Sequence, residues 1–578
     1  MIYPAKDSFF EEISGRSVSD ILLLFSGSVI VFLPLIFSGN WFDSHDGIRY
    51  LCLFEQFRDA FKEGIIYPRW LPDNYGGYGY PDFVFYQPAF FYFVLAVSFI
   101  VGDVLFSFCA TLVLILFLGA LGVYKLFCRL FNNFVALFGG LLFIITPYIF
   151  VNIYVRGDLA EFASMMLIPW NLYFLIRMRD SIDAGRSIVY DFIVSGILAS
   201  LLVYTHPFTA MFFYPIFVLF SFLFSIDAGS KNAIRFSCLA VLLLLMGASL
   251  SAPYWFNAAM MKDYVNYKSA LSGELQAHMH MLSPYQLFSR RWSFGGSVPG
   301  VSETEMSFQL GLPHFILACV GFLFSSHKRY KLVFILYIVL IISMLSPCAF
   351  LWRNIPLLRI VQFPWRLLSV IAMLQMICVG DCLMRISRFK TNTKIIVLAF
   401  ISFIFLSSYW PMFFMKTSVA PVREVLRQHV EGRKMIMASY SSFNEFFPSY
   451  IPNPPNEARG TREMLQLPEG SGAKAVKLAD SSPYRYLALI SSPSAVEARV
   501  LQFYFPSFCV KVDHKDISDL IKNESDGTFS FPVPAGDEHL VEIFYAGTPF
   551  DFGALIILLA GTSVSLGIGL SFKKRKKV

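Results

Sequence analysis

The sequence has 578 residues, of which 56% are hydrophobic and 15% are charged, and its mean hydropathy is +0.58. Soluble domains carry about one charged residue in four, so this composition excludes a water-soluble protein and predicts a chain embedded in a membrane. The net charge of +7 does not indicate a nucleic-acid partner, because much of it lies in short loops and in the basic tail at 573–577, which is typical of a cytoplasmic anchor against anionic lipid.

Apolar runs long enough to form transmembrane helices recur along the whole chain. They lie at 19–38, 103–125, 133–151, 160–177, 188–205, 207–226, 234–256, 311–325, 331–347, 365–384, 394–414 and 550–571. A further apolar stretch at 88–101 is short for a span. If it crossed the membrane, Lys125 and Arg129 would fall outside and the later basic loops would invert. If it lies along the surface, every basic cluster falls on one side, as the positive-inside rule requires.

We therefore predict an α-helical polytopic membrane protein with about twelve transmembrane helices and both termini in the cytoplasm. The stretch 88–101 is expected to form a juxtamembrane helix on the outer face. This topology puts the loop 39–102, the turn near 152–160, the loop 257–310 and the segment 415–548 outside.

The first outer turn carries a cluster of ionisable side chains. Residues 41–47 read WFDSHDG, which places Asp43, His45 and Asp46 at the predicted membrane surface. Ionisable groups near hydrocarbon cost several kcal/mol, so an acid pair at this position indicates a functional site. The alternative is that these acids only mark the point where the chain leaves the bilayer.

The rest of the first outer loop contains two recognisable segments. Residues 47–63 place apolar side chains at helical spacing opposite charged ones, which predicts an amphipathic helix lying flat on the bilayer interface. Residues 67–88 then read YPRWLPDNYGGYGYPDFVFYQP, a stretch dense in aromatics, glycine and proline that includes Arg69.

A second polar cluster falls on the same face in the turn IYVRGDLAEF, which contains Arg156, Asp158 and Glu161. His206 and Arg366 occupy two further outer helix ends. Each residue also has a simpler interpretation. Asp158 could cap the following helix and Glu161 could complete a capping box, while His206 could end a helix and Arg366 could extend towards the interface.

Acids and cations that converge at a lipid–water boundary suit displacement at a carbon that bears a phosphate leaving group. A carboxylate can accept the proton of an attacking hydroxyl, and arginine can bind the departing phosphate through two hydrogen bonds. The 63 phenylalanines suit the long lipid that would carry the phosphate. The nine cysteines show no CxxC pair, and GxGxxG, P-loop and HExxH motifs are absent, so zinc and nucleotide chemistry have no motif support.

The segment 415–548 changes character, because turn-forming residues separate short alternating runs such as YRYLALI and HLVEIFY. This pattern predicts a β-sandwich of about 100–130 residues. We therefore expect three parts: a transmembrane domain at 1–414, a periplasmic β-rich domain at 415–548, and a final helix with a basic tail at 549–578.

The order of span, outer acid, aromatic-proline helix and acidic outer turn resembles the C-type (GT-C) membrane glycosyltransferase superfamily. The motifs HDG, YVRGDLAEF, QFPWRLL and 67–88 resemble, more closely, bacterial membrane proteins labelled "6-pyruvoyl-tetrahydropterin synthase-related", although nothing in the sequence indicates pterin chemistry. The stretches FYFPSFCVKVDHKD and VPAGDEHLVEIFY are similar to the outer β-domain of YfhO-like polytopic proteins.

This resemblance implies an inverting glycosyltransferase of the bacterial inner membrane with its active site facing the periplasm. It would move a sugar from a polyprenyl-phosphate donor to a glycan, lipid or protein acceptor. Asp46 or Asp43 maps onto the superfamily's catalytic base, and Asp158 onto the acid that orients the acceptor or a metal. Some members bind a divalent cation and others do not, so a metal stays open. The expected phosphate- and substrate-binding residues are Arg156, Glu161, His206, Arg366, His45 and Arg69.

Two other classes of function stay in view. A lipid-glycan transporter or flippase would use the same cavity for binding alone, but transporters show repeated halves and polar groups at mid-membrane depth, and neither is visible here. A non-catalytic protein of cell-envelope assembly is the third interpretation.

Overall fold

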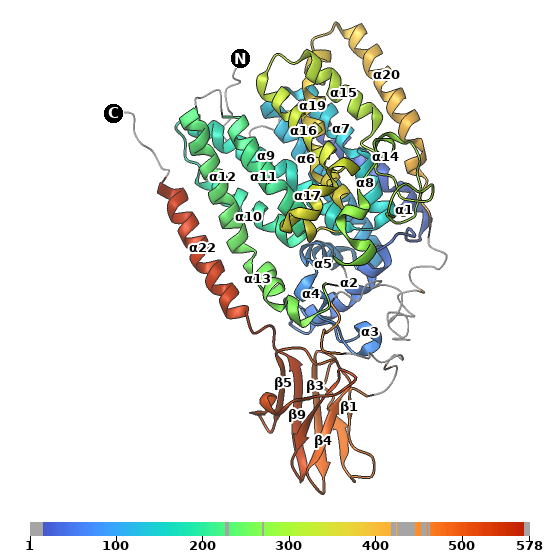
Figure 1. Ribbon diagram of the computed structural model, residues 1–578, viewed down its shortest axis with the longest axis vertical. Helices are drawn as coiled ribbons and strands as arrows, with labels where there is room; N and C mark the ends of the chain where they lie inside the picture. Colours follow the sequence, from blue (N-terminus) through green and yellow to red (C-terminus); the bar gives the residue numbers. More distant parts are fainter. Residues whose placement is uncertain are drawn as a thin grey trace.

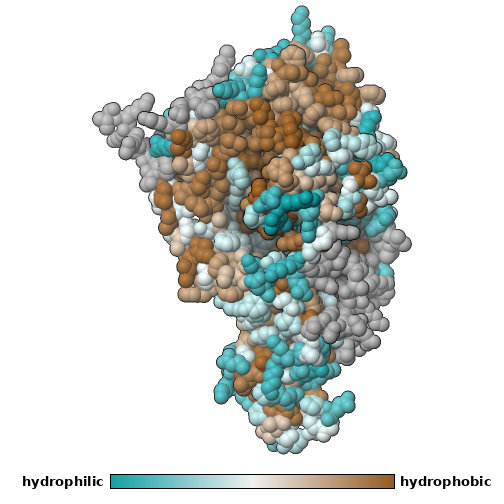
Figure 2. Space-filling model, viewed as in Figure 1, coloured by the Kyte–Doolittle hydropathy of each residue, from teal (hydrophilic) through white to brown (hydrophobic). Residues whose placement is uncertain are grey.

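The computed structural model describes residues 15–225, 230–268, 271–417, 424, 446–451, 459 and 463–571. The predicted basic tail at 573–577 and most of 418–445 lie outside the described residues. A helical body carries a β-domain at one end, and the last helix runs along the side of the body away from that domain (Figure 1). Apolar residues gather over the helical body, whereas polar residues prevail over the β-domain (Figure 2).

The helical body is built from long helices and a few short ones. Its longer helices are α1 (Gly15–Ser38), α6 (Val104–Leu130), α7 (Asn133–Ile144), α9 (Leu159–Asp183), α10 (Val189–Thr205), α11 (Pro207–Leu223), α12 (Ser230–Leu250), α13 (Ala252–Met261), α15 (Leu312–Phe324), α16 (Lys328–Ser343), α19 (Leu368–Ile386), α20 (Thr391–Tyr409) and α22 (Asp551–Ser571). Its shorter pieces are α8 (Pro147–Phe150), a π-helical turn at Val151–Arg156, α14 (Pro284–Phe288), α17 (Ala349–Asn354) and α18 (Pro356–Arg359). Short 3-10 turns lie at Lys262–Tyr264, Gly273–Leu275, Ala277–His280, Ser346–Cys348, Pro364–Leu367 and Trp410–Phe413.

Each of the predicted spans coincides with helix in the structure. Among the described residues, eight helical stretches are long and apolar enough to cross a membrane. The other four predicted spans correspond to α10, α11, α15 and α16, which have 17, 17, 13 and 16 residues. The helical, polytopic architecture is thus confirmed, while the number of crossings and their orientation stay predictions.

Close packing of α6 against α9 positions the acidic turn at 152–160. A Cβ atom on Gly122 would lie 2.9 Å from Trp170, and one on Gly119 would lie 2.2 Å from the sulfur of Met166. Glycine at these two positions therefore lets the helices approach closely. Since α9 begins directly after Asp158, this contact also fixes where the acidic turn lies.

The first outer loop folds into α2 (Gly47–Lys62), α3 (Asn74–Gly77), α4 (Asp82–Phe85) and α5 (Ala89–Val101). The amphipathic helix predicted at 47–63 and the short helix predicted at 88–101 are both confirmed. The apolar face of α2 does not face lipid, however, because Leu51, Phe54 and Phe57 are buried in protein. Phe57 lies 5.0 Å from Phe83 between ring centroids. Other protein segments cover this face, which corrects the expectation of an interfacial helix.

The β-domain consists of two antiparallel sheets. One has the strand order β1-β4-β8-β7 and the other has the order β2-β3-β9-β5-β6. The strands are β1 (Leu465–Gln466), β2 (Lys474–Lys477), β3 (Arg485–Ser492), β4 (Val496–Val500), β5 (Phe508–Val512), β6 (Lys515–Asp516), β7 (Lys522–Asn523), β8 (Phe529–Val533) and β9 (Gly536–Tyr545), with a 3-10 turn at Ser518–Leu520. Residues from both sheets, including Ala488, Val541, Ala498 and Phe531, share one fully buried core. This arrangement is a β-sandwich.

Candidate functional site

Backbone hydrogen bonds join the turns at 41–47 and 152–160, which more than a hundred residues separate in the sequence. The amide of Asp46 donates to the carbonyl of Arg156 at 2.8 Å, and the amide of His45 donates to that of Val155 at 3.0 Å. Gly157 makes this approach possible. Its φ is +65°, and a Cβ atom there would lie 2.4 Å from the amide nitrogen of Gly47. The two polar clusters that the sequence analysis expects on one face therefore lie against each other in the structure.

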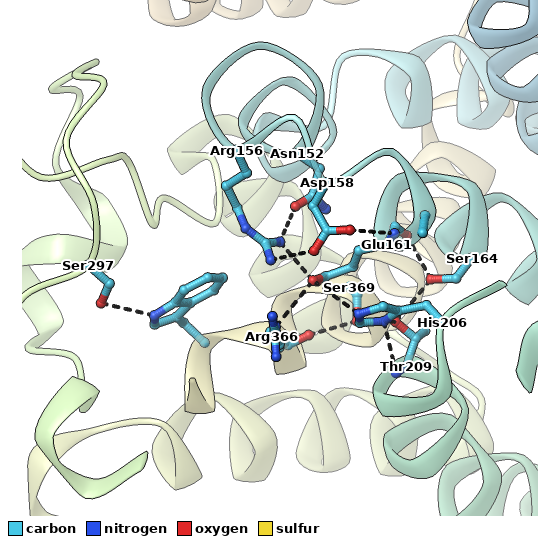
Figure 3. Close-up of polar contacts among 12 residues, drawn as sticks. Asn152, Arg156, Asp158, Glu161, Ser164, His206, Thr209, Ser297, Arg366 and Ser369 are labelled. Carbon is cyan, nitrogen blue, oxygen red and sulfur yellow. Dashed lines mark hydrogen bonds and ion pairs between the residues drawn. The ribbon is translucent and has the colours of Figure 1, made fainter. Parts of the chain in front are cut away.

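The second turn forms a buried cluster of charges around the guanidinium group of Arg156 (Figure 3). Arg156 donates to Asp158 Oδ2 and to Glu161 Oε2, each at 2.7 Å. The side chain of Glu161 is 0% exposed and that of Asp158 is 9% exposed. Because a buried charge is tolerated only when it is paired, these three residues hold one another in place.

Asp158 caps α9 as well as pairing with Arg156. Its Oδ1 accepts a hydrogen bond from the amide of Glu161 at 3.0 Å, so the capping interpretation is confirmed. The hydroxyl of Tyr50 donates to the same oxygen at 3.3 Å. Burial acts to raise the pKa of Asp158, but Arg156, with His206 and Arg366, lowers it to about 2. Asp158 is therefore ionised at neutral pH.

Glu161 does not complete a capping box in the described contacts. Its carboxylate instead accepts from the hydroxyl of Tyr148 at 2.6 Å and from Arg156. It also lies between two further groups, with Oε2 at 3.9 Å from His206 Nε2 and at 3.6 Å from Arg366 Nε. Glu161 thus links Arg156 to His206 and Arg366.

His206 ends α10 and caps α11. Its Nδ1 accepts from the amide of Thr209 at 3.2 Å, so the proton of the neutral ring lies on Nε2, which faces Glu161. Burial lowers the pKa of His206, which keeps the ring neutral at pH 7. The prediction that His206 ends a helix is confirmed, and the same residue joins the cluster.

Arg366 brings donors that its surroundings leave unused. Its guanidinium carbon lies 5.1 Å from the ring centre of Phe208 and 5.3 Å from that of Phe363. Its Nε and Nη1 are buried and make no hydrogen bond within the described part of the chain. Although Nε also lies 3.6 Å from Glu161 Oε2, the N–H groups of these two nitrogens are available to an anion such as phosphate.

The first turn is joined to this cluster through the backbone of Asp46, whose amide donates to the carbonyl of Arg156. Desolvation raises the pKa of Asp46, and the negative charge of Asp158 raises it further, against the effect of Arg49 and Arg156. Asp43 lies apart, because its carboxylate pairs with Lys416 at 2.8 Å. His45 is exposed, and its Nε2 contacts the carbonyl of Phe294 at 2.9 Å. The charge of Asp158 thus acts on the carboxyl group of Asp46, while the Asp43 carboxylate is paired with Lys416.

Arg69 does not join the site. Its Nη1 pairs with Asp551 Oδ2 at 2.7 Å, and its Nη2 donates to the carbonyl of Pro253. This places Arg69 where the first outer loop meets α13 and the start of α22. Its contacts are structural ones between distant segments.

Four residues in or beside the site escaped the sequence analysis. Tyr50 and Tyr148 hydrogen-bond to the two buried acids, and Trp365 lies under Arg156 at 4.7 Å from its guanidinium carbon. Arg49 is a charged neighbour of Asp46. The pair Trp365–Arg366 in QFPWRLL was the available signal for Trp365, whereas no sequence pattern distinguishes these two tyrosines from the other 26 of the 28 in the chain.

The sequence left open whether the site binds a divalent cation. The geometry of the cluster shows whether its side chains could hold one. Asp158, Glu161 and His206 each offer an atom within 4.8 Å of the others. Both carboxylates, however, already pair with Arg156 at 2.7 Å, and His206 Nδ1 accepts from Thr209. A cation would have to displace the guanidinium group from both acids, so this arrangement does not fit a resident metal.

Residues 83–414 match the model of a family described as "6-pyruvoyl-tetrahydropterin synthase related domain; membrane protein". The chain belongs to this family. The match includes the second outer turn, His206 and Arg366, while Asp46 precedes it. The chain is therefore a membrane protein.

Solved structures similar to this family member include three of the Archaeoglobus fulgidus oligosaccharyltransferase. The apo form has a TM-score of 0.46 and 14% identity, and the form tethered to an acceptor peptide has 0.43 and 12%. AglB in complex with an inhibitory peptide and a dolichol-phosphate has 0.41 and 14%. The matches cover 77–78% of this chain and span 62–63% of the length of those proteins. No curated protein matches the chain.

Proposed function

We propose that this protein is an inverting glycosyltransferase of the bacterial inner membrane that takes its sugar from a polyprenyl-phosphate donor at the periplasmic face. One observation carries the proposal: among the described residues, buried donors of Arg366 that make no hydrogen bond lie in the same charge cluster as Asp158, which in turn acts on the carboxyl group of Asp46. An anion site and a base of raised pKa are thereby supplied by one site.

In the proposed reaction, the acceptor hydroxyl attacks the anomeric carbon of the donor while Asp46 takes the hydroxyl proton. The new carbon–oxygen bond forms as the bond to phosphate breaks, and the polyprenyl phosphate leaves with the electron pair. A single displacement of this kind inverts the anomeric centre. A general base contributes about 10²–10⁴-fold in rate, and the raised pKa of Asp46 brings it closer to the pH at which it must accept a proton.

The other residues divide into binding and positioning roles. Arg366 would bind the phosphate through its unused N–H groups. Arg156 and Glu161 would fix the position of Arg366, since Glu161 lies 3.6 Å from it and is itself held by Arg156. Asp158 was expected to orient the acceptor, but its oxygens already accept from Tyr50, Glu161 and Arg156, which favours a role in orienting Arg156.

The test uses purified protein with radiolabelled polyprenyl-phosphate sugars and measures release of the label to acceptor or to water. Asp46→Asn is expected to lower the rate at least about 10²-fold while binding of polyprenyl phosphate, followed by native mass spectrometry, persists. Arg366→Gln is expected to weaken that binding.

Asp43→Asn is the matched control, because Asp43 lies three residues away in the same turn but pairs with Lys416. It should retain the wild-type rate. An Asp46→Asn variant that transfers sugar at the wild-type rate would contradict the proposal. If Asp43→Asn alone lost activity, the base would be Asp43.

A further inference from the structure

The aromatic loop at 67–88 takes no part in the proposed reaction, yet it is deeply buried against the β-domain. The indole of Trp70 donates to Gln502 Oε1 at 2.7 Å, and Gln502 Nε2 donates to the carbonyls of Pro72 at 2.9 Å and Gly77 at 3.1 Å. Trp70 is 5% exposed and Gln502 is 1% exposed. A single glutamine of the β-domain thus binds three points of the loop.

The shape of the loop is adapted to this docking. Gly79 has a φ of +82°, and a Cβ atom there would lie 2.4 Å from the ring of Trp70 and 2.5 Å from Gln502 Oε1. Tyr75 is a buried residue with a φ of 51°, a conformation that costs a non-glycine residue about 1 kcal/mol or more. Its ring lies 5.3 Å from that of Phe503 in the β-domain. The contact with the β-domain therefore accompanies a strained loop conformation.

A chain of buried polar contacts runs from the docked loop back towards the acid turn. Asn74 Nδ2 donates to Asp82 Oδ2 at 2.5 Å, and Asn74 Oδ1 accepts from Gln56 at 2.6 Å. Asp82, which is 1% exposed, pairs through its other oxygen with Arg49 at 3.2 Å. Asn74 and Gly77 both belong to α3, and Gln502 hydrogen-bonds to the carbonyl of Gly77. The contact with the β-domain therefore also fixes Asn74, and through Asn74 the position of Asp82.

Arg49 connects this chain to the proposed base. It lies in the first turn of α2, three residues after Asp46, and its guanidinium carbon is 5.1 Å from the ring centre of Tyr86. Asp158, Arg49, Arg156 and His45 act on the pKa of Asp46, and Asp46 in turn acts on the neighbouring Tyr86. Arg49 is the member of this set that is tied to the β-domain, since its carboxylate partner is Asp82.

We propose that Asp82 and Asn74 are positioning residues that link the docked β-sandwich to Arg49, and through Arg49 to Asp46. The β-domain then sets the electrostatic environment of the acid turn from a distance, without touching the substrate. This inference rests on the proposed function only where it calls Asp46 the base.

The test reads the ionisation of Asp46 directly, by the pH dependence of carbodiimide labelling of its carboxyl group in the full-length protein, followed by mass spectrometry. Arg49→Gln is expected to move the labelling midpoint upwards by about 1 pH unit, because it removes a nearby positive charge. Asp82→Asn is expected to move it downwards, because the charge of Arg49 is no longer neutralised. A purely structural role predicts no such opposite shifts.

The link to the β-domain is tested with Gln502→Ala, alone and combined with Arg49→Gln. Alone, it should shift the midpoint in the same direction as Asp82→Asn, since the loop no longer holds Asp82 against Arg49. In the Arg49→Gln background it should add nothing. An equal shift in both backgrounds, or no shift with Arg49→Gln, overturns the proposal.

Matched controls come from the same helix. Arg58→Gln and Asp59→Asn change the same residue types in α2, where they take part in ion pairs with Glu55 and Lys62. Neither should move the midpoint. If the labelling shifts occur while Asp46→Asn transfers sugar normally, the link stands and the assignment of Asp46 as base falls. Loss of transfer in Asp46→Asn without the labelling shifts gives the reverse result.

Discussion

Asp158 combines a local role with a long-range one, because its carboxylate caps α9 and also pairs with Arg156. The two roles can be separated by substitution. Asparagine caps helices about as well as aspartate, so Asp158→Asn removes the charge alone, while Asp158→Ala removes charge and cap.

We expect Asp158→Asn to destabilise the protein by about 1–3 kcal/mol, because Arg156 loses one of its two buried carboxylate partners. Asp158→Ala should cost about 1 kcal/mol more through the lost cap. The measurement is the unfolding midpoint of the purified protein in detergent. Equal stability of the two variants would show that the cap contributes nothing.

The contribution of ionised Asp158 to stability should also depend on pH, and it should be lost at low pH. The pKa of Asp158 is lowered from 3.8 to about 2 in the folded protein. Its contribution is therefore fully present above about pH 4 and is lost as the pH falls towards 2. The Asp158→Asn variant should therefore lose less stability than the wild type as the pH falls from about 4 towards 2. The loss of stability that comes from other groups should be unchanged.

At the scale of elements, the contact between the turns 41–47 and 152–160 depends on Gly157. Its φ of +65° disfavours other residues, and a Cβ atom would overlap with Gly47 and with Ser44 Oγ at 2.4 Å. Gly185 offers a matched control, since its φ is +66° and a Cβ atom there would meet nothing within 4 Å.

Gly185→Ala should therefore lower the free energy of unfolding by only about 1 kcal/mol, through the strain of a positive φ in a residue with a Cβ atom. Gly157→Ala should cost about 2–4 kcal/mol, because the overlap adds to this strain. It should also lower sugar transfer, since the two turns that form the site are pushed apart. Unfolding midpoints and transfer rates of the two variants check this, and equal effects would mean that the close approach contributes nothing.

The helices and the placement of the two acidic turns on one face could be predicted from the sequence because both follow from local signals. The length of the apolar runs marks the spans. The distribution of Lys and Arg among the loops then predicts that the two acidic turns lie on the same face. The contacts of individual residues could not be predicted. Asp43 and Asp46 are equivalent in the motif DSHD, and they differ because Lys416, distant in the sequence, pairs with Asp43. Similarly, Gln502 shows no sequence signal for its contact with Trp70.

At the scale of the whole molecule, the β-domain is held between the first outer loop and the last helix. Asp551 begins α22, and its carboxylate accepts from Arg69 at 2.7 Å and from Asn257 at 2.9 Å. Thr548, just after the last strand, donates its amide to the same carboxylate at 3.0 Å. One acid therefore joins the loop, α13 and the segment that leaves the β-domain.

This geometry separates two roles for Arg69, as a binder of donor phosphate and as a structural partner of Asp551. If Arg69 is structural, Arg69→Gln and Asp551→Asn should each lower stability, and together they should cost about 1 kcal/mol less than the sum of the single effects. Both should leave binding of polyprenyl phosphate at the wild-type level, since Arg366 supplies the anion site. If Arg69 binds phosphate, Arg69→Gln alone should weaken that binding and the two substitutions should add. Unfolding midpoints and native mass spectrometry on the same four proteins decide between the two roles.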